Sequence, residues 1–358
     1  MRIAILGAGH GGHTMAADLS LAGHETTIYE LPQYRQNLEG IRQRGGIELT
    51  GKARTGFARI ALATTDIREA ISGAELIMVV TPAFGHQVFI EKFSPNLEDG
   101  QVVVFNTGNF ASLVCANYLK RMRIKKNVTI AETECLIYAC RVTAPGKAWV
   151  MAVKDRLKLA ALPATRTKKA LDVATKAFPQ FYGGKNVLET SITNINFAIH
   201  PVSTIMNAGK IEEQGAYQTS HYDTTPSIAR VMEAVDAERS VLAKALGLGS
   251  VSTKETLLRY YGAKGSNLYE ALVDSYAYKV QTSPADLRSR YITEDVPYGL
   301  VPVASLGEIL KIQMPTIRAI IDLCSAANAT DYWREGLTAE KLGLRGLTIR
   351  QITTLVNG

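Results

Sequence analysis

The most constraining feature of this chain lies within its first thirty residues. A short apolar run, residues 3–6, is followed at once by the turn Gly7-Ala8-Gly9-His10-Gly11-Gly12, and then by helical periodicity that ends near Gly23. A second predicted strand, residues 25–29, ends in Glu30. This order of strand, glycine turn, helix, strand and acidic residue predicts a dinucleotide-binding βαβ unit.

The glycines of the turn follow the GxGxxG pattern, and each has a physical task. Gly7 allows the tight turn, Gly9 lets the backbone approach a pyrophosphate, and Gly12 lets the helix pack closely on the strand. The helix N-terminus offers N–H groups and a partial positive charge to the phosphates. We therefore expect the turn, including His10 and Gly11, to hold the pyrophosphate of a dinucleotide.

Glu30 bears on the choice between the two nicotinamide dinucleotides. A carboxylate at the end of the second strand accepts hydrogen bonds from the adenosine ribose hydroxyls and repels the 2′-phosphate of NADP. Arg35 follows closely in the sequence, however, and an arginine can accommodate that phosphate. The sequence predicts NAD as the cofactor and leaves NADP possible.

Strand-like and helical patterns continue to alternate after this unit. Buried apolar runs occur at residues 76–80, 102–105 and 128–131, which predicts an α/β fold with a Rossmann-type, doubly wound parallel sheet. Ligands of such sheets bind beyond the carboxyl ends of the strands. The residues that follow two of these strands are therefore predicted to contact the cofactor: Thr81, Pro82, Asn106 and Gly108.

The pattern changes near Gly183-Gly184, and long helical periodicities such as residues 231–246 dominate afterwards. We therefore expect two domains. Residues 1–185 would form the dinucleotide-binding domain, and residues 186–358 a mostly helical domain for substrate and catalysis.

Composition excludes several classes of protein. The chain has 358 residues, 46% of them hydrophobic and 20% charged, which is too apolar for a disordered chain. The net charge of +7 is not gathered into a basic stripe with aromatics, so no nucleic-acid partner is expected. No apolar stretch reaches about 18 residues, so no membrane span is expected. The four cysteines form no CxxC pair and no signal peptide is visible, which predicts reduced thiols, no metal site and a cytoplasmic location.

Two segments in the second half carry a resemblance to a known family. They are Asn194-Ile195-Asn196-Phe197-Ala198-Ile199-His200-Pro201 and the run from Arg290 to Pro302, which contains Glu294-Asp295-Val296 and Gly299-Leu300-Val301-Pro302. Smaller matching pieces are Cys140-Arg141, residues 233–239, Gly336 and residues 341–344. Together with the N-terminal turn, these segments resemble the opine dehydrogenases, which include octopine, nopaline and N-(1-carboxyethyl)norvaline dehydrogenases. The resemblance covers nearly the whole chain.

The resemblance implies an activity and a set of site residues. Such enzymes use NAD(P)H to join an amino acid reductively to a 2-oxo acid such as pyruvate, and their helical domain is of the 6-phosphogluconate-dehydrogenase type. By match to the family's motifs, His200 and Asp295 would be the catalytic pair and Arg290 the anchor of the oxo-acid carboxylate. Asn196 and Cys140 would also contact substrate. The implied partners are these small molecules, and a homodimer is possible.

The chemistry of these residue types supports the same assignment. Near pH 7 an imidazole such as His200 can take and give a proton, and a carboxylate such as Asp295 on its far nitrogen would hold the tautomer. A planar guanidinium binds a carboxylate through two parallel hydrogen bonds, a role open to Arg290 and also to Arg288. Glu134 follows a strand at the ligand edge, and we hypothesise that it pairs with a cationic amino-acid side chain.

Two alternative functions remain, one of them another dehydrogenase and the other of a different class. Dehydrogenases of the ketopantoate-reductase or glycerol-3-phosphate-dehydrogenase kind have a similar plan but depend on a lysine in the helical domain, and residues 194–201 contain none. A non-catalytic NAD(H)-binding sensor would keep the glycine turn but could lose His200, Arg290 and Asp295 together. All three are present, which favours the enzyme.

Overall fold

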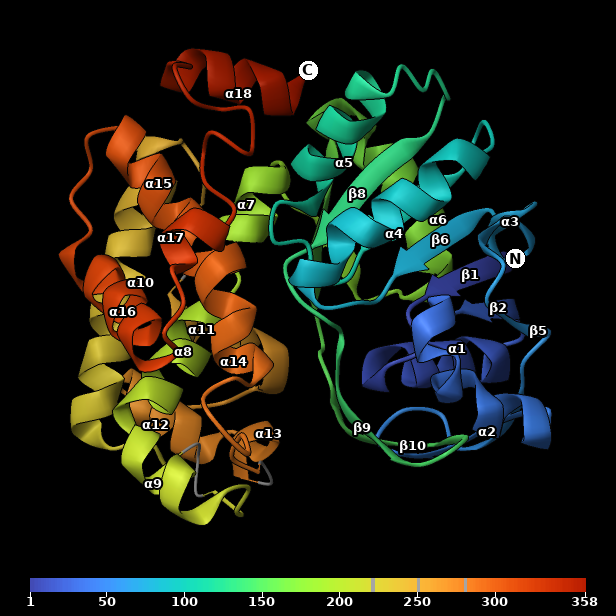
Figure 1. Ribbon diagram of the computed structural model, residues 1–358, viewed down its shortest axis with the longest axis horizontal. Coiled ribbons are helices and arrows are strands. Elements are labelled where there is room, and N and C mark those ends of the chain that lie inside the picture. The colour runs from blue at the N-terminus through green and yellow to red at the C-terminus, as the bar shows by residue number, and fades with distance from the viewer. Residues whose placement is uncertain (220–222, 250–251, 280–281) are drawn as a thin grey trace. The chain divides into compact units, whose positions relative to one another are not determined.

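The computed structural model describes residues 1–219, 223–249, 252–279 and 282–358. The chain divides into two compact units, shown in Figure 1. Unit 1 comprises Met1–Thr190 with Asn357–Gly358, and unit 2 comprises Ser191–Val356. The division falls inside helix α7 (Val187–Ile192), close to the change of pattern in the sequence.

The main sheet of unit 1 has eight strands. All neighbouring strands pair in parallel except β8 and β11, which run antiparallel with Leu159 opposite Thr133. In spatial order the strands are β12 (Phe181–Gly183), β11 (Leu157–Leu162), β8 (Thr129–Thr133), β7 (Val102–Phe105), β6 (Leu76–Val79), β1 (Arg2–Leu6), β2 (Glu25–Tyr29) and β5 (Leu62–Thr64). The expected doubly wound sheet is confirmed. At one edge it also has two strands, β11 and β12, that run opposite to the other six.

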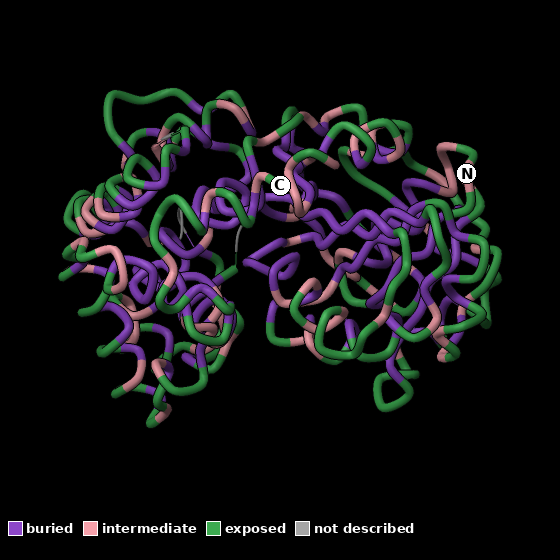
Figure 2. The backbone as a smooth tube through the Cα atoms, turned by 90° about the horizontal axis from the view of Figure 1, so that it is seen from above, coloured by how far each residue is buried: buried purple, intermediate pink, exposed green. Residues whose placement is uncertain are grey.

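The central strands are buried on both faces, as their continuous apolar runs require. Every residue of β6, β7 and β8 is buried, and these strands lie in the purple interior of unit 1 in Figure 2. On one face, Leu6, Val79 and Phe105 pack in one cluster with side chains of α3, α4 and α5. On the other face, α1 approaches Ile5, whose Cγ2 lies 3.8 Å from an ideal Cβ on Gly12.

Helices connect the strands of this sheet. Their bounds in unit 1 are α1 (His10–Leu21), α2 (Gln36–Arg44), α3 (Ile67–Ile71), α4 (His86–Phe93), α5 (Ala111–Arg121) and α6 (Thr167–Ala177), with α7 reaching into unit 2. Three 3-10 turns, Pro32–Tyr34, Ala83–Gly85 and Ser94–Asn96, flank α2 and α4. The 3-10 turn Ala164–Arg166 leads into α6.

A second, four-stranded sheet in unit 1 was not predicted from the sequence. Its order is β4 (Gly56–Arg59), β3 (Gly46–Gly51), β10 (Lys147–Val153) and β9 (Tyr138–Ala144). Asp18 of α1 ties this sheet to the helix, because its carboxylate accepts hydrogen bonds from the Tyr138 hydroxyl at 2.6 Å and from Arg54 at 3.0 Å. Strands β9 and β10 lie between β8 and β11 in the chain, and β11 then pairs antiparallel with β8.

In the part of unit 2 that the structure describes, the regular elements are helices (Figure 1, yellow to red), and one isolated β-bridge joins Gln218 to Thr282. No helix among the described residues is long and apolar enough to cross a membrane. The helices are α8 (Asn196–Met206), α9 (Ala208–Gln214), α10 (Pro226–Ala245), α11 (Thr253–Tyr261), α12 (Leu268–Asp274), α13 (Tyr276–Lys279), α14 (Arg290–Thr293), a π-helical turn η6 (Val296–Leu300), α15 (Val301–Ile309), α16 (Pro315–Ala327), α17 (Tyr332–Glu335) and α18 (Ile349–Asn357).

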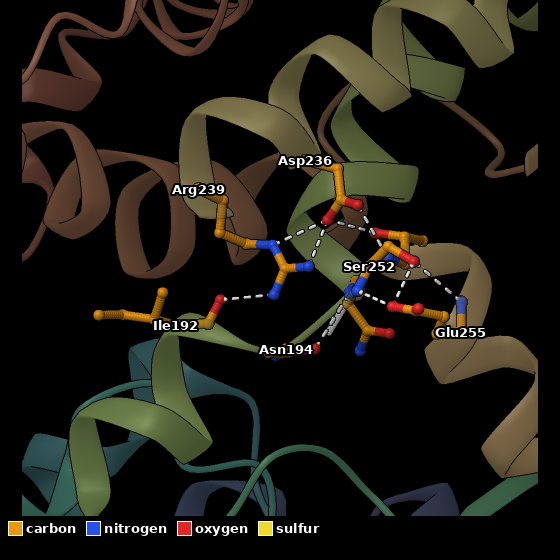
Figure 3. A network of polar contacts seen from close by, with 8 residues as sticks. Ile192, Asn194, Asp236, Arg239, Ser252 and Glu255 are labelled. Carbon is orange, nitrogen blue, oxygen red and sulfur yellow. Dashed lines mark hydrogen bonds and ion pairs between the residues drawn. The ribbon is translucent and has the colours of Figure 1, made fainter. Parts of the chain in front are cut away.

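A buried ion pair joins three elements of unit 2, as Figure 3 shows. Arg239 of α10, 1% exposed, donates from Nε to Asp236 at 3.0 Å and from Nη1 to the carbonyl of Ile192 at 3.0 Å. Asp236 also accepts the backbone N–H of Thr253 at 2.8 Å and its hydroxyl at 2.7 Å. The pair therefore fixes α10 to the start of α11 and to the segment that leads into α8.

Two residues late in the chain belong to unit 1. The side-chain oxygen of Asn357 accepts a hydrogen bond of 2.9 Å from the Asn186 amide. An ideal Cβ at Gly358 would lie 2.9 Å from Cβ of Pro163. The chain thus passes from unit 1 to unit 2 after Thr190 and returns after Val356.

Candidate functional site

The glycine turn between β1 and α1 has the tight geometry that its sequence predicts. Gly7 has φ +108°, and a Cβ there would lie 2.4 Å from the carbonyl oxygen of Val80. A Cβ at Gly12 would lie 1.8 Å from the carbonyl oxygen of Gly7. Both glycines are therefore required by the fold itself, because the turn and α1 approach β1 and the end of β6 at backbone distance.

Gly9 differs from these two glycines. It is the N-cap of α1, and a Cβ there would meet no atom of the described residues within 4 Å, its chain neighbours apart. The first turn of α1 carries no acidic side chain and the cap makes no side-chain hydrogen bond. An open approach to backbone N–H groups at a helix N-terminus is what a pyrophosphate needs, so the residues present fit a dinucleotide.

Glu30 lies beside this turn and is 6% exposed. Its carboxylate accepts hydrogen bonds from the backbone N–H of Ala8 at 2.9 Å, from that of Leu31 at 2.8 Å and from the Asn37 amide at 3.2 Å. These donors hold a negative charge at the end of β2, next to the glycine turn. A carboxylate at such a position can accept hydrogen bonds from hydroxyl groups and repels phosphate groups.

His10 connects the turn to the second sheet of unit 1. Its Nδ1 lies 2.9 Å from the backbone N–H of Val142 on β9. Because a backbone N–H can only donate, Nδ1 is the acceptor and the ring proton lies on Nε2. His10 therefore sets the distance between the first turn of α1 and the strand that also carries Cys140 and Arg141.

The turns after β6 and β7 lie at the same sheet edge as the glycine turn, because β1, β6 and β7 are parallel neighbours. Thr81 and Pro82 begin the turn after β6, where the Pro82 carbonyl accepts the N–H of Gly85 at 2.8 Å. Asn106 donates from its amide to the carbonyl of Val104 at 3.0 Å, and a Cβ on Gly108 would meet Glu132 at 2.6 Å. The four predicted cofactor residues thus occupy one edge.

His86 follows the turn after β6 but is enclosed by the core. It is 4% exposed, its ring packs edge-on against Phe105 at 5.2 Å, and burial lowers its pKa to about 3. Its Nε2 has no hydrogen-bond partner within the described parts of the chain. The side chain is therefore a neutral core group at pH 7.

The residues predicted to bind the amino acid from unit 1 are buried. Glu134 follows β8, is 0% exposed, and accepts the backbone N–H of Lys158 at 2.9 Å. Lys158 pairs in turn with Glu189 at 3.1 Å. Cys140 on β9 is 4% exposed, and its carbonyl accepts a hydrogen bond from the Arg141 side chain at 3.0 Å. This part of unit 1 therefore holds buried carboxylates close to the sheet edge.

In unit 2, the structure brings His200 and Asp295 together although 95 residues separate them. Nδ1 of His200 lies 2.8 Å from Oδ2 of Asp295, and the two residues are 5% and 2% exposed. The buried carboxylate accepts a hydrogen bond from the Nδ1–H group, which leaves Nε2 as the nitrogen that can take or give a proton. The pair has the geometry of an oriented general acid–base group.

Helix α8 positions His200 and also carries Asn196. His200 is in α8 directly before Pro201, which has no N–H and therefore cannot donate to the carbonyl of Phe197. Asn196, the first residue of α8, lies one turn before His200 on the same helical face, and its N–H donates to the Asn194 side chain at 3.0 Å. Asn196 and His200 thus share one face of α8.

Helix α14 and the residue pair after it form two adjacent i, i+4 pairs. Arg290, whose side chain is 49% exposed, lies 3.3 Å from the buried carboxylate of Glu294. Tyr291 and Asp295 form the next pair, and both contact His200: the rings of Tyr291 and His200 stack at 4.2 Å with 23° between their planes. Sequence reasoning assigned no role to Tyr291 or Glu294, although their spacing from their partners is visible in the sequence.

The two candidate arginines have different surroundings. Arg288 donates from Nη2 to the carbonyl of Asn328 at 3.4 Å and so caps a neighbouring segment. Arg290 extends from α14, with its Cζ 5.4 Å from the centroid of the Tyr291 ring that stacks on His200. Arg290 and His200 thus both contact the ring of Tyr291, and no such contact links Arg288 to His200 among the described residues.

Comparison with known proteins adds independent evidence. Residues 183–328 match the model of the NAD/NADP octopine/nopaline dehydrogenase α-helical domain. Residues 2–123 match the model of the NAD-dependent glycerol-3-phosphate dehydrogenase N-terminus. The match in the first half is thus shared with the glycerol-3-phosphate dehydrogenases, one of the alternatives considered above. The match in the second half distinguishes the opine dehydrogenases from them.

The relatives span the whole chain. An opine dehydrogenase of Arthrobacter sp. (strain 1C) is 36% identical over 353 residues, covering 99% of this chain and 98% of the relative. A protein named ocs of Agrobacterium tumefaciens (strain Ach5) is 26% identical over 362 residues, covering 100% and 99% of the two chains.

A solved octopine dehydrogenase with NADH and L-arginine shares the fold, with a TM-score of 0.80, 21% identity and coverage of 99% and 98%. The fold, the geometry of the glycine turn and the full-length identity to the Arthrobacter relative all indicate the same family. The chain therefore belongs to the opine dehydrogenase family of NAD(P)-dependent oxidoreductases, which act on CH–NH groups.

Proposed function

We propose that this chain catalyses the reversible, NADH-dependent condensation of an amino acid with a 2-oxo acid such as pyruvate to give a secondary amine dicarboxylate. The observation that carries the proposal is the buried contact of 2.8 Å between His200 and Asp295, beside Arg290, in a member of this family. The contact supplies an acid–base group, and Arg290 supplies a carboxylate anchor.

In this proposal, Arg290 binds the oxo-acid carboxylate through its guanidinium and so fixes the orientation of the reacting carbon. Glu294, which follows α14 four residues after Arg290, keeps the guanidinium in place through its buried carboxylate. Bound NADH would supply the hydride that reduces the imine carbon. Asn196 and Cys140 are proposed as further substrate contacts.

His200 moves the protons that the condensation requires. The neutral imidazole takes a proton from the amine that has added to the oxo carbon and gives it to the oxygen, which forms the carbinolamine. A second proton, taken up from solvent by His200, lets that oxygen leave as water. The nitrogen keeps its remaining hydrogen, hydride addition to the carbon completes the secondary amine, and the histidine ends in its starting state. Asp295 stays ionised, holds the Nδ1 proton and stabilises the imidazolium. A buried pair with a fixed tautomer avoids the cost of reorienting water at each transfer.

We propose NADH as the preferred cofactor over NADPH. The support is the carboxylate of Glu30, which is held by the N–H groups of Ala8 and Leu31 beside the glycine turn. Gly9, His10, Gly11 and Gly12 would hold the pyrophosphate, and Thr81, Pro82, Asn106 and Gly108 would line the rest of the cofactor edge.

Glu134 is our candidate for recognising the amino acid. A carboxylate at this edge would pair with a cationic side chain such as that of arginine or lysine. The Glu134→Gln variant should reduce kcat/KM for basic amino acids relative to apolar ones by about tenfold, because the charge pairing is lost. Unchanged relative rates would contradict this part of the proposal.

The experiment that tests the proposed function measures NADH oxidation by absorbance with a panel of amino acids and 2-oxo acids. We expect oxidation only when both an amino acid and an oxo acid are present, and a secondary amine product by mass spectrometry. The same rate with the oxo acid alone would instead indicate a 2-hydroxy-acid dehydrogenase. His200→Ala should lower kcat by about 10²–10⁴ and leave the Kd for NADH nearly unchanged.

A further inference from the structure

Tyr291 contacts the pair of His200 and Asp295, and the proposed function gives it no role. Its ring is 7% exposed, and its centroid lies 4.2 Å from that of the His200 imidazole, with the planes inclined by 23°. Asp295, one helical turn later, bonds the edge of the same imidazole at 2.8 Å. The imidazole is thus held on one face by an aromatic ring and on one edge by a carboxylate.

The same tyrosine ring also contacts the carboxylate anchor. Cζ of Arg290 lies 5.4 Å from the ring centroid, within the range of a cation–π interaction. The ring therefore lies in contact with both groups that would carry positive charge during the reaction, the guanidinium and the imidazolium. Aromatic faces attract cations because their π electrons give them a negative potential.

We propose that Tyr291 is a positioning residue for His200. Its ring face fixes the plane of the imidazole, so that Nε2 points toward the substrate, and stabilises the imidazolium that forms each time His200 takes a proton. Tyr291 itself exchanges no proton, since His200 gains one at Nε2 and returns it within the same cycle. The inference rests on the acid–base role proposed for His200 and adds a role for a residue that the proposed function does not use.

The proposal makes the ring, and not the hydroxyl group, the important part of Tyr291. Phenylalanine would keep the stacking area and the π face, whereas leucine would keep only apolar bulk. Loss of a cation–π contact of this kind changes a rate by about tenfold. The pair Tyr291→Phe and Tyr291→Leu therefore separates stacking from simple filling of space.

The kinetic test compares these two variants with a matched control, Tyr260→Leu. Tyr260 is a buried tyrosine of unit 2, 1% exposed on α11, whose ring contacts are with Tyr261 and Arg259. We expect Tyr291→Phe to keep kcat within about twofold and Tyr291→Leu to lose about tenfold in kcat, with the KM for NADH unchanged in both. Tyr260→Leu should lower the Tm and leave kcat nearly unchanged.

A spectroscopic test is independent of activity. A hydrogen on an imidazole that stacks on an aromatic ring is shielded by that ring. With 13C-labelled histidine, the Cε1–H signal of His200, identified by its loss in His200→Ala, should lie upfield in the native protein and in Tyr291→Phe. In Tyr291→Leu it should move downfield. An unmoved signal would show that the ring does not stack on His200 in solution and would overturn the inference.

The outcomes distinguish the inference from the proposed function. Full activity of His200→Ala would contradict the proposed function itself. Low activity of His200→Ala with native kcat in Tyr291→Leu would overturn only the role of Tyr291. Equal losses in Tyr291→Phe and Tyr291→Leu would assign the effect to the hydroxyl group and overturn the stacking role, and so would a loss in Tyr260→Leu as large as that in Tyr291→Leu.

Discussion

The carboxylate of Glu30 accepts a hydrogen bond of 2.9 Å from the backbone N–H of Ala8, inside the glycine turn. Glu30, the residue that we propose as the selector of the cofactor, therefore also holds the glycine turn in place. A change at Glu30 should alter cofactor choice, and the substitute must still accept the Ala8 bond if the turn is to keep its shape.

Glu30→Gln removes the charge and keeps an oxygen that can accept the Ala8 N–H. The ratio of kcat/KM for NADPH to that for NADH should rise by about tenfold or more, because the 2′-phosphate no longer meets a carboxylate. Steady-state rates with both cofactors measure this ratio. Glu25→Gln, at the exposed start of the same strand, serves as the control, and an unchanged ratio in Glu30→Gln would rule out the assignment of Glu30.

Alanine at Gly9 and alanine at Gly12 should have different effects. A Cβ at Gly9 meets no protein atom within 4 Å, so Gly9→Ala should fold with a native Tm and bind NADH at least about tenfold more weakly. A Cβ at Gly12 would lie 1.8 Å from the Gly7 carbonyl, so Gly12→Ala should lower the Tm of the protein as well. Fluorescence titration with NADH and thermal unfolding check both. Native NADH affinity in Gly9→Ala would show that no phosphate approaches this glycine.

Asp295→Asn tests the orientation of His200. The amide cannot stabilise an imidazolium as a carboxylate does and can favour the wrong tautomer, so kcat should fall by about 10²–10⁴. The Kd for NADH should stay unchanged, because the substitution lies in unit 2 and the glycine turn in unit 1. Asp322→Asn, at an aspartate of α16 that accepts a hydrogen bond from Trp333, is the control. Equal kcat in the two variants would contradict the role of Asp295.

The buried ion pair of Asp236 and Arg239 should be costly to break on one side. Arg239→Met leaves the carboxylate of Asp236 buried without its cation, so the free energy of unfolding should fall by about 3–5 kcal/mol. Arg345→Met, which removes one partner of an exposed pair with Glu340, should change it by about 1 kcal/mol or less. Urea denaturation followed by circular dichroism measures both, and similar losses in the two variants would be inconsistent with burial as the cause.

His86 gives unit 1 a defined dependence on pH. Burial lowers its pKa to about 3 in the folded protein, against an ordinary value of 6.5. Below pH 6.5 the unfolded chain binds a proton that the folded chain does not, so the free energy of unfolding falls as the pH falls toward 3. Between pH 7 and pH 5 this group should cost about 2 kcal/mol. Urea denaturation of His86→Gln should show a correspondingly smaller loss over this interval, and an identical loss would contradict the burial of a neutral imidazole.

Sequence patterns predicted those features of unit 1 that depend on a few neighbouring residues. The glycine turn, the apolar runs and Glu30 follow from backbone conformation and periodicity over a few residues, and they lie as expected. The sheet of β3, β4, β9 and β10 was not predicted. Its strands are partly exposed, and its two hairpins, β3–β4 and β9–β10, are joined by a pairing over a long sequence distance, that of β3 with β10, which sets Lys147 opposite Glu48. Pairing at such range leaves little trace in a local window.

The candidate site shows the same limit. No local pattern links His200 to Asp295 across 95 residues, and only the resemblance to a family suggested the pair. The spacing of Tyr291 and Asp295 is local, however, and a helix at this point would have placed both on one face. Helix α14 has only four residues before the π-helical turn, which is too short for a hydrophobic period to reveal it.

The return of residues 357–358 to unit 1 makes unit 2 an insertion in the chain of its neighbour. If unit 2 unfolds while unit 1 stays folded, the released polypeptide is anchored at both ends and is a closed loop, not a free tail. A closed loop has fewer conformations than a tail of equal length, so less entropy is gained on unfolding. The hydrogen bond between Asn186 and Asn357 helps to hold the end of this loop on unit 1. By keeping the loop closed, it favours folded unit 2 through the entropy of the unfolded chain and not through packing.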